Sequence, residues 1–244
     1  NLEVDTVAPV PGSLVVTGKD VSGADNTEVT ATPAVTLSLN AEGATEYRVG
    51  HDEAFGGQAW TAFDVTTRSW VLMPGDGAKQ VYVQYRDAVG NTTTPISGSI
   101  TLDTQAPQAP FIILNNGDEF TNGSAVTANL SATNATEMRL SVDGAFDDEA
   151  WVAYASEQEV ALNDVEGVQE VAVMFKDPAG NISVTVSDVI HRDITPPTLK
   201  TFELPGIQPD DDGFLWVTED VATLNFEIIA DDGASGVEGI ALLE

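Results

Sequence analysis

The chain has 244 residues, 42% of them hydrophobic, so it carries enough apolar side chains for one or two buried cores. Thirty-nine acidic residues against nine basic ones give a formal net charge of −30, which excludes a protein that binds the phosphate backbone of nucleic acids. Cysteine is absent, so disulfides and thiolate metal sites are excluded as well. No run of 18 apolar residues and no basic-then-apolar leader occurs, so we expect no membrane span in this chain and an export signal outside it.

Stretches that alternate apolar and polar residues indicate half-buried strands. In chain order the clearest are Val35–Leu39, Val81–Tyr85, Val126–Leu130, Val171–Phe175 and Leu224–Ile228, with Gly239–Leu243 as a further candidate. Turn-forming sequences separate them, as at Pro74–Gly77 and Asn115–Asp118. No apolar stripe keeps helical spacing for three turns. About seven strands per repeat, with turns every 8–12 residues, predict a two-sheet sandwich.

The sequence is also internally repeated. Asp5–Pro9 (DTVAP) recurs as Asp103–Pro107 (DTQAP) and, in looser form, as Asp193–Pro197 (DITPP). Further matches keep their order between the copies, notably Arg86–Asn91 (RDAVGN) with Lys176–Asn181 (KDPAGN). We therefore predict an all-β chain of tandem immunoglobulin-like β-sandwich domains joined by short Pro-containing linkers. The predicted boundaries are 1–102 for the first repeat, 103–192 for the second, and 193–244 for a partial third repeat that is truncated or completed elsewhere.

These repeats resemble the tandem Ig-like modules of large bacterial surface and adhesin-like proteins. The resemblance covers residues 1–197 and rests on four motifs: Tyr47–Asp52 (YRVGHD), Met138–Gly144 (MRLSVDG), Gly75–Gln84 (GDGAKQVYVQ) and Leu102–Pro107 (LDTQAP). The first copy has His51-Asp52-Glu53 where Asp-Gly is usual, so that turn departs from the family pattern. The resemblance implies the fold and an extracellular or cell-surface location. It does not imply one function, because such modules serve as stalks, spacers and binders.

Catalysis is not expected. The two histidines, His51 and His191, occupy non-equivalent positions without a nucleophile–base arrangement nearby in the sequence, and no cofactor motif occurs. Trp60 and Trp151 occupy equivalent positions in the two copies. An aromatic residue at one position of each sandwich favours a core plug between the sheets, and an exposed platform for sugars is the alternative.

The acidic loops could hold calcium. In an immunoglobulin-type topology, Asp76 lies in a loop at the far end of the first repeat, Asp103 and Asp193 stand at the two junctions, and Asp177 and Asn181 lie in a loop of the second repeat. Such oxygen ligands suit Ca²⁺, so we predict these five residues as an inter-domain calcium set. The alternative is that Asp-x-x-Gly-Asn is a hairpin turn and that the acidic loop tips are solvated.

Three functions are consistent with the sequence. The leading one is a structural extender or stalk of a bacterial extracellular adhesin-like fibre protein, stiffened by calcium and by linker prolines. The second is a module that binds carbohydrate or protein, and the third is a spacer in a secreted polysaccharide-degrading enzyme. The expected partners are neighbouring repeats of the same chain, other copies in a fibre, or a host or cell-surface ligand.

Overall fold

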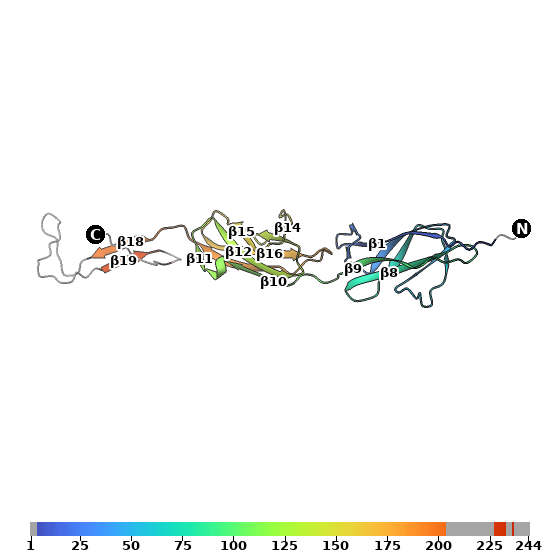
Figure 1. The fold of residues 1–244 in the computed structure, drawn as a ribbon. Coiled ribbons are helices and arrows are strands. Elements are labelled where there is room, and N and C mark those ends of the chain that lie inside the picture. Colours follow the sequence, from blue (N-terminus) through green and yellow to red (C-terminus); the bar gives the residue numbers. More distant parts are fainter. Residues whose placement is uncertain (1–3, 204–226, 233–235, 237–244) are drawn as a thin grey trace, which may run out of the picture.

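The computed structural model describes residues 4–203, 227–232 and 236. These residues are almost entirely strands and turns, and their one helical element is the three-residue 3-10 turn η1 (Asn115–Gly117). No helix among them is long and apolar enough to cross a membrane. Figure 1 shows the described strands in three groups that follow one another along a single long axis. The predicted all-β sandwich class is therefore confirmed.

The first group, which we call unit 1, comprises the strands of residues 10–102. Their bounds are β1 (Val10–Lys19), β2 (Asp25–Asn26), β3 (Val29–Thr30), β4 (Ala34–Glu42), β5 (Glu46–Gly50), β6 (Thr61–Ala62), β7 (Thr67–Val71), β8 (Gly77–Arg86) and β9 (Ile96–Leu102). They form a four-stranded sheet in the order β2-β1-β4-β7 and a five-stranded sheet in the order β3-β9-β8-β5-β6. Neighbours are antiparallel except β3 and β9, which run parallel.

The second group, unit 2, comprises the strands of residues 108–192. Their bounds are β10 (Gln108–Leu114), β11 (Phe120–Thr121), β12 (Ala125–Thr133), β13 (Glu137–Ser141), β14 (Val152–Ala153), β15 (Glu157–Ala161), β16 (Gly167–Lys176) and β17 (Val186–Arg192). The sheet orders β10-β12-β15 and β11-β17-β16-β13-β14 reproduce the order of unit 1, except that β2 has no counterpart. The register is reproduced as well: Tyr47 lies opposite Tyr85 in unit 1, and Met138 lies opposite Phe175 in unit 2.

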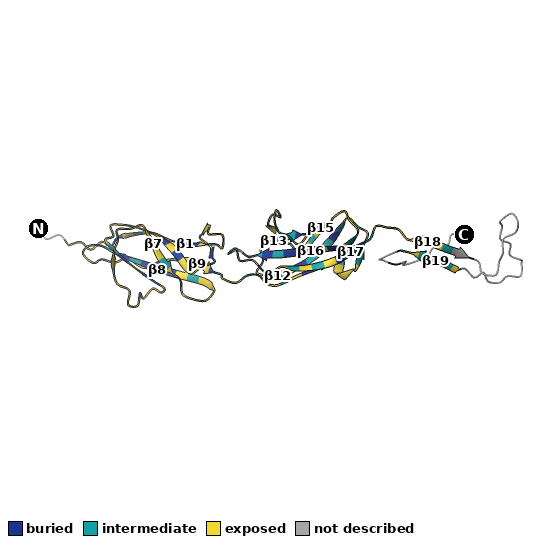
Figure 2. Cartoon of the chain, turned by 180° about the vertical axis from the view of Figure 1, so that it is seen from behind, coloured by how far each residue is buried: buried dark blue, intermediate teal, exposed yellow. Residues whose placement is uncertain are grey.

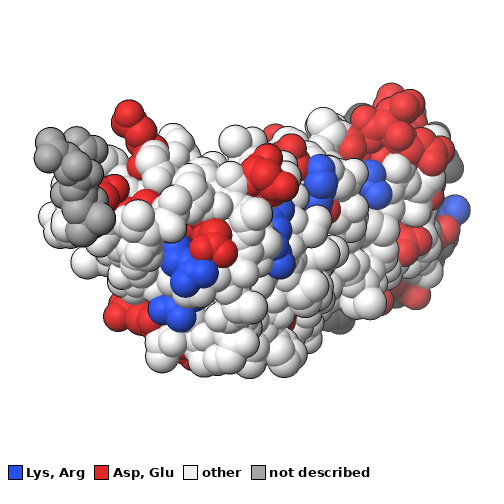
Figure 3. Space-filling model, turned by 90° about the vertical axis from the view of Figure 1, so that its right-hand side faces the viewer, with Lys and Arg blue, Asp and Glu red and all other residues white. Residues whose placement is uncertain are grey.

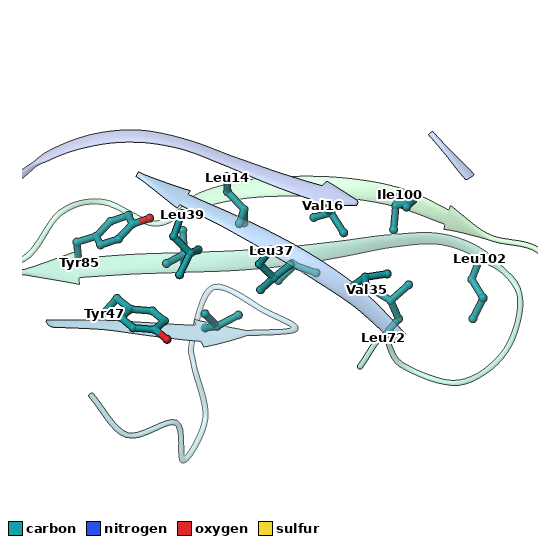
Figure 4. Packing of buried hydrophobic residues seen from close by; sticks show 13 residues of the cluster. Leu14, Val16, Val35, Leu37, Leu39, Tyr47, Leu72, Tyr85, Ile100 and Leu102 are labelled. Carbon is teal, nitrogen blue, oxygen red and sulfur yellow. The ribbon is translucent and has the colours of Figure 1, made fainter. Parts of the chain in front are cut away.

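Each unit has its own core between its two sheets. In unit 1 the predicted alternation is confirmed, because Val35, Leu37 and Leu39 of β4 are buried in the same cluster as Tyr85 and other inward residues of β8 (Figure 4). In unit 2 the strands β12 and β16 do the same. Figure 2 shows buried residues alternating with more exposed ones along the strands, and the loops mostly exposed. The two buried clusters share no residue.

The third group consists of β18 (Thr198–Glu203) paired with β19 (Glu227–Asp231). The predicted strand at Leu224–Ile228 overlaps β19 only at its end, and Leu224 and Phe226 lie outside the described residues. Residues 239–243, the other candidate strand in this segment, also lie outside them.

Candidate functional site

The Asp-x-x-Gly-Asn sequences form the same tight turn in both units. In unit 2 the Asp177 carboxylate accepts hydrogen bonds from the Asn181 backbone N–H and from Asn181 Nδ2, both at 2.9 Å. In unit 1 the Asp87 carboxylate accepts the same two bonds from Asn91, at 2.9 and 2.8 Å. The glycine before the asparagine has a positive φ in each turn, which explains the glycine there. The hairpin-turn interpretation of this motif is thus correct for its local geometry.

The asparagine of each turn also holds the chain segment that enters its unit. Asn181 Nδ2 lies 3.1 Å from the Asp103 carbonyl oxygen and 3.4 Å from that of Gln105. Asn91 Nδ2 lies 3.2 and 3.4 Å from the carbonyl oxygens of Asp5 and Val7 in the same way. One amide therefore ties the linker to the unit that follows it.

A second contact crosses directly from unit 1 to unit 2. The turn after β1 donates the Val21 N–H to the Ala179 carbonyl oxygen at 3.0 Å, and Ala179 is fully buried. Gly180 lies so close beneath this turn that an added Cβ would stand 3.3 Å from Val21 N and 3.4 Å from Val21 Cβ. A hollow of about 390 Å³ runs alongside this contact, with Trp151 and Lys176 in its wall.

The linker between the units is held from both sides. The Asp76 carboxylate of unit 1 accepts hydrogen bonds from Thr104 N (3.3 Å), Thr104 Oγ1 (2.9 Å) and Gln105 Nε2 (3.1 Å). From unit 2, Asn134 Nδ2 donates to Asp103 Oδ2 at 2.9 Å. Asn134 was not among the predicted site residues. The sequence does mark this position, because Asn134 stands where the first copy has Gly43. Both residues adopt a positive φ, a conformation that favours glycine or asparagine.

The predicted calcium residues come together only in part. Asp103, Asp177 and Asn181 meet at the junction, whereas Asp76 is turned to the linker side chains, and Asp193 lies at the next junction. The carboxylate oxygens of Asp103 and Asp177 already accept N–H donors. In the described part of the chain, no three His, Cys, Asp or Glu side chains gather closely enough to hold a metal ion. The residues present therefore do not fit a closed Ca²⁺ cage, and calcium here stays a prediction from the sequence.

Equivalent aspartates have opposite pKa shifts because only one of them lies at the junction. Burial raises the pKa of Asp177 above its ordinary value, and the nearby charge of Asp103 adds to that effect. For Asp87, burial acts in the same direction, but hydrogen bonds from Asn91, Gly90 and Val89 outweigh it and lower the pKa. The Asp87 turn therefore stabilises the fold above the ordinary pKa and loses this stabilisation as the pH falls through the folded-state pKa. For Asp177 the stabilisation is present below the ordinary pKa and is lost as the pH rises through the raised one.

We predict that an NMR titration finds the pKa of the Asp87 carboxyl below the ordinary value of an aspartate and the pKa of the Asp177 carboxyl above that value. In Asp103→Asn, the removal of one negative charge is expected to lower the Asp177 pKa and to leave Asp87 unchanged. An Asp177 carboxyl that titrates at or below Asp87 would show that the junction does not bury it.

The prediction that Trp60 and Trp151 plug the core is wrong. Both are half-buried, and two guanidinium groups lie over the Trp60 ring, with Arg48 Cζ 4.8 Å and Arg86 Cζ 4.5 Å from its ring centroids. Arg48 also lies 4.6 Å from the Phe55 ring, and Arg86 forms an ion pair with Glu46. These residues belong to β5, β8 and the loop after β5, so they form a stack rather than a core contact.

Unit 2 repeats this stack with one conservative exchange. Arg139 (5.0 Å) and Lys176 (4.6 Å) both lie over the Trp151 ring, Arg139 also contacts Phe146 (4.9 Å), and Lys176 pairs with Glu137. In a chain with only nine Lys and Arg residues, four of them stand in these two stacks. On the face drawn in Figure 3, basic side chains lie in a broken row with acidic side chains on either side. Two cations lie over each tryptophan ring, so at least one face of each indole is occupied.

Comparisons with known proteins return folds rather than a family. No family model matches the chain, and no curated protein matches it. Among solved structures, the chain is similar to the CbhA fibronectin(III)-like modules of Clostridium thermocellum, with 14% identity over 74% of this chain and 94% of that one, at a TM-score of 0.40. It is also similar to the FN1–FN3 domains of chicken CNTN1 (12% identity, 79% and 68% covered, TM-score 0.38). The human OSCAR ligand-binding domain matches at 13% identity, with 75% and 99% covered and a TM-score of 0.36.

Proposed function

We propose that this chain is a stiff extender: a stalk segment of a bacterial extracellular or cell-surface, adhesin-like protein, without catalytic activity of its own. The fold is that of fibronectin(III)- and Ig-like modules, which serve as structural or binding domains. The single observation that supports an extender most is the linker, because hydrogen bonds from both units hold it.

Four of the five linker residues take part in hydrogen bonds, and the fifth is a buried proline. Asp103 and Gln105 offer their carbonyl oxygens to Asn181 of unit 2, and Thr104 donates to Asp76 of unit 1. The Ala106 carbonyl oxygen accepts a bond of 2.7 Å from Gln108 Nε2, and Pro107 is buried and has a fixed φ. A linker bound to both neighbours cannot act as a free hinge, so the direction of one unit sets the direction of the next.

The second junction begins in the same way. Glu166 of unit 2 accepts hydrogen bonds from Ile194 N (2.9 Å) and Thr195 Oγ1 (2.7 Å), as Asp76 does from Thr104. Asp193 accepts a bond from Thr195 N at 3.1 Å, as Asp103 does from Gln105. A contact pattern used twice along one chain supports a repeated, direction-setting connector.

We predict that Gly180→Ala loosens the junction and that Gly90→Ala does not. Both glycines have a positive φ, so each substitution strains its turn by about 1–2 kcal/mol. Only the Cβ at 180 would press against Val21, because nothing lies within 4 Å of a Cβ at 90. Residual dipolar couplings are expected to fit one alignment tensor for both units in the wild type and in Gly90→Ala, and to require two tensors in Gly180→Ala.

A wild type whose two units need separate tensors would overturn the extender proposal. The same measurement in calcium and in excess chelator separates the two sources of stiffness. Units that share one tensor in both conditions are held by the hydrogen bonds described above. Units that share a tensor only with calcium, with the loss reproduced by Asp103→Ala, are held by a bound ion, as the sequence alone predicts.

A further inference from the structure

Unit 1 carries a second copy of the junction surface, and no second unit among the described residues covers it. The turn Asp87–Asn91 is equivalent to the turn of unit 2 that receives unit 1. In unit 2 its central residue, Ala179, is fully buried under the Val21 contact, whereas the equivalent Val89 of unit 1 is 65% exposed. A Cβ at Gly180 would meet the neighbouring unit, and one at Gly90 would meet nothing within 4 Å.

The uncovered turn is already in its docked form. Asp87 Oδ1 accepts the N–H groups of Val89, Gly90 and Asn91 at 3.0, 2.8 and 2.9 Å, so the turn is rigid before any partner arrives. The entering segment is also in place, because Asn91 holds the carbonyl oxygens of Asp5 and Val7. A preorganised surface costs little conformational entropy to bind.

The complementary surface is the turn after β1, which also keeps its shape through its own bonds. Asp20 Oδ1 accepts hydrogen bonds from Ser22 Oγ (2.6 Å) and Ala24 N (2.9 Å), and Gly23 N donates to the Asp20 carbonyl oxygen at 3.0 Å. These bonds leave the Val21 N–H free to donate across the junction. Both partners of that bond are backbone groups, so the change from Ala179 to Val89 leaves donor and acceptor intact.

We infer that the Asp87–Asn91 turn is a docking face for the Asp20–Gly23 turn of a second copy of unit 1, with the incoming Val21 N–H donating to the Val89 carbonyl oxygen. This inference rests on the proposed extender function and names the partner of the Asp87–Asn91 face of unit 1. Repetition of the same contact continues an interface that the chain already forms once.

The test uses a chain in which residues 1–102 are followed directly by residues 5–244. Asp5 then takes the place of Asp103 after Leu102, so the linker spacing is retained. The protein has no cysteine, so single cysteines report exposure by their rate of reaction with a maleimide. Val89→Cys is compared in the ordinary chain and in the second copy of the duplicated chain. Ala179→Cys serves as the buried standard, and Val184→Cys, at a residue 72% exposed, serves as the exposed one.

Docking predicts that Val89→Cys reacts about tenfold more slowly in the duplicated chain than in the ordinary one, because labelling then requires the junction to open. Equal rates, with Ala179→Cys still slow in the duplicated chain, would overturn the inference and leave the extender function standing. Fast labelling of Ala179→Cys in the ordinary chain would instead show that the existing junction is open, and both proposals would then fail.

Discussion

Replacing Phe175 with alanine is expected to lower the free energy of unfolding of unit 2 by about 3–5 kcal/mol, the usual cost of removing a fully buried phenylalanine. The side chain is 0% exposed and lies near the end of β16, where it packs into the core and contacts Tyr154 edge-on at 5.8 Å. For a unit of this size, each 1 kcal/mol shifts the melting temperature by about 4–8 °C, so the transition of unit 2 is expected to move by more than 10 °C.

The same substitution should leave unit 1 unchanged, because the two cores share no residue. Differential scanning calorimetry is expected to resolve one shifted and one unshifted transition. Phe111→Ala is the matched control: this phenylalanine of β10 is 51% exposed, so its loss creates no cavity and costs little. A calorimetric trace in which both transitions move together would contradict independent cores and would make the two units one cooperative body.

The strands could be predicted because their side chains alternate with a period of two. Leu37 and Val81 lie in such stretches, and burial of one face is what that pattern requires. The turn at Asp177–Asn181 could also be predicted, since its aspartate, glycine and asparagine each have a local backbone role. Local rules were sufficient wherever a residue interacts with its own neighbours in the chain.

Contacts between distant groups could not be predicted in this way. The bond from Val21 to Ala179 joins two backbone groups, and backbone groups leave no trace in side-chain identity. The predicted position of Trp60 was wrong for another reason. The prediction considered only the burial of an aromatic ring in the core, whereas the residues that hold this ring outside the core are arginines on two different strands. Trp60 and its equivalent Trp151 each have Arg or Lys partners on two neighbouring strands. This shared pattern can be recognised only once the pairing of β5 with β8 is known.

Trp60→Ala is expected to destabilise unit 1 by about 2–3 kcal/mol, less than a core aromatic but more than a surface residue. The ring contacts the guanidinium groups of Arg48 on β5 and Arg86 on β8. Its removal exposes apolar surface and forfeits two cation–π contacts. Chemical denaturation of unit 1 measures the loss, and Trp70→Ala is the control, a half-buried tryptophan on which no cation of the described residues stacks.

A double-mutant cycle between Trp60→Ala and Arg48→Met isolates the electrostatic part of this stack. Methionine keeps most of the aliphatic volume of Arg48 and removes its charge, so the coupling free energy reports the cation–π contact rather than packing. We expect a coupling of about 1 kcal/mol, the size found for partly exposed pairs. The guanidinium is already oriented by two bonds to Gln84 Oε1, at 2.9 and 2.6 Å, so little entropy is lost when it meets the ring. A coupling of zero would mean that Trp60 stabilises the unit only by covering apolar surface, and that the cations beside it serve solubility alone.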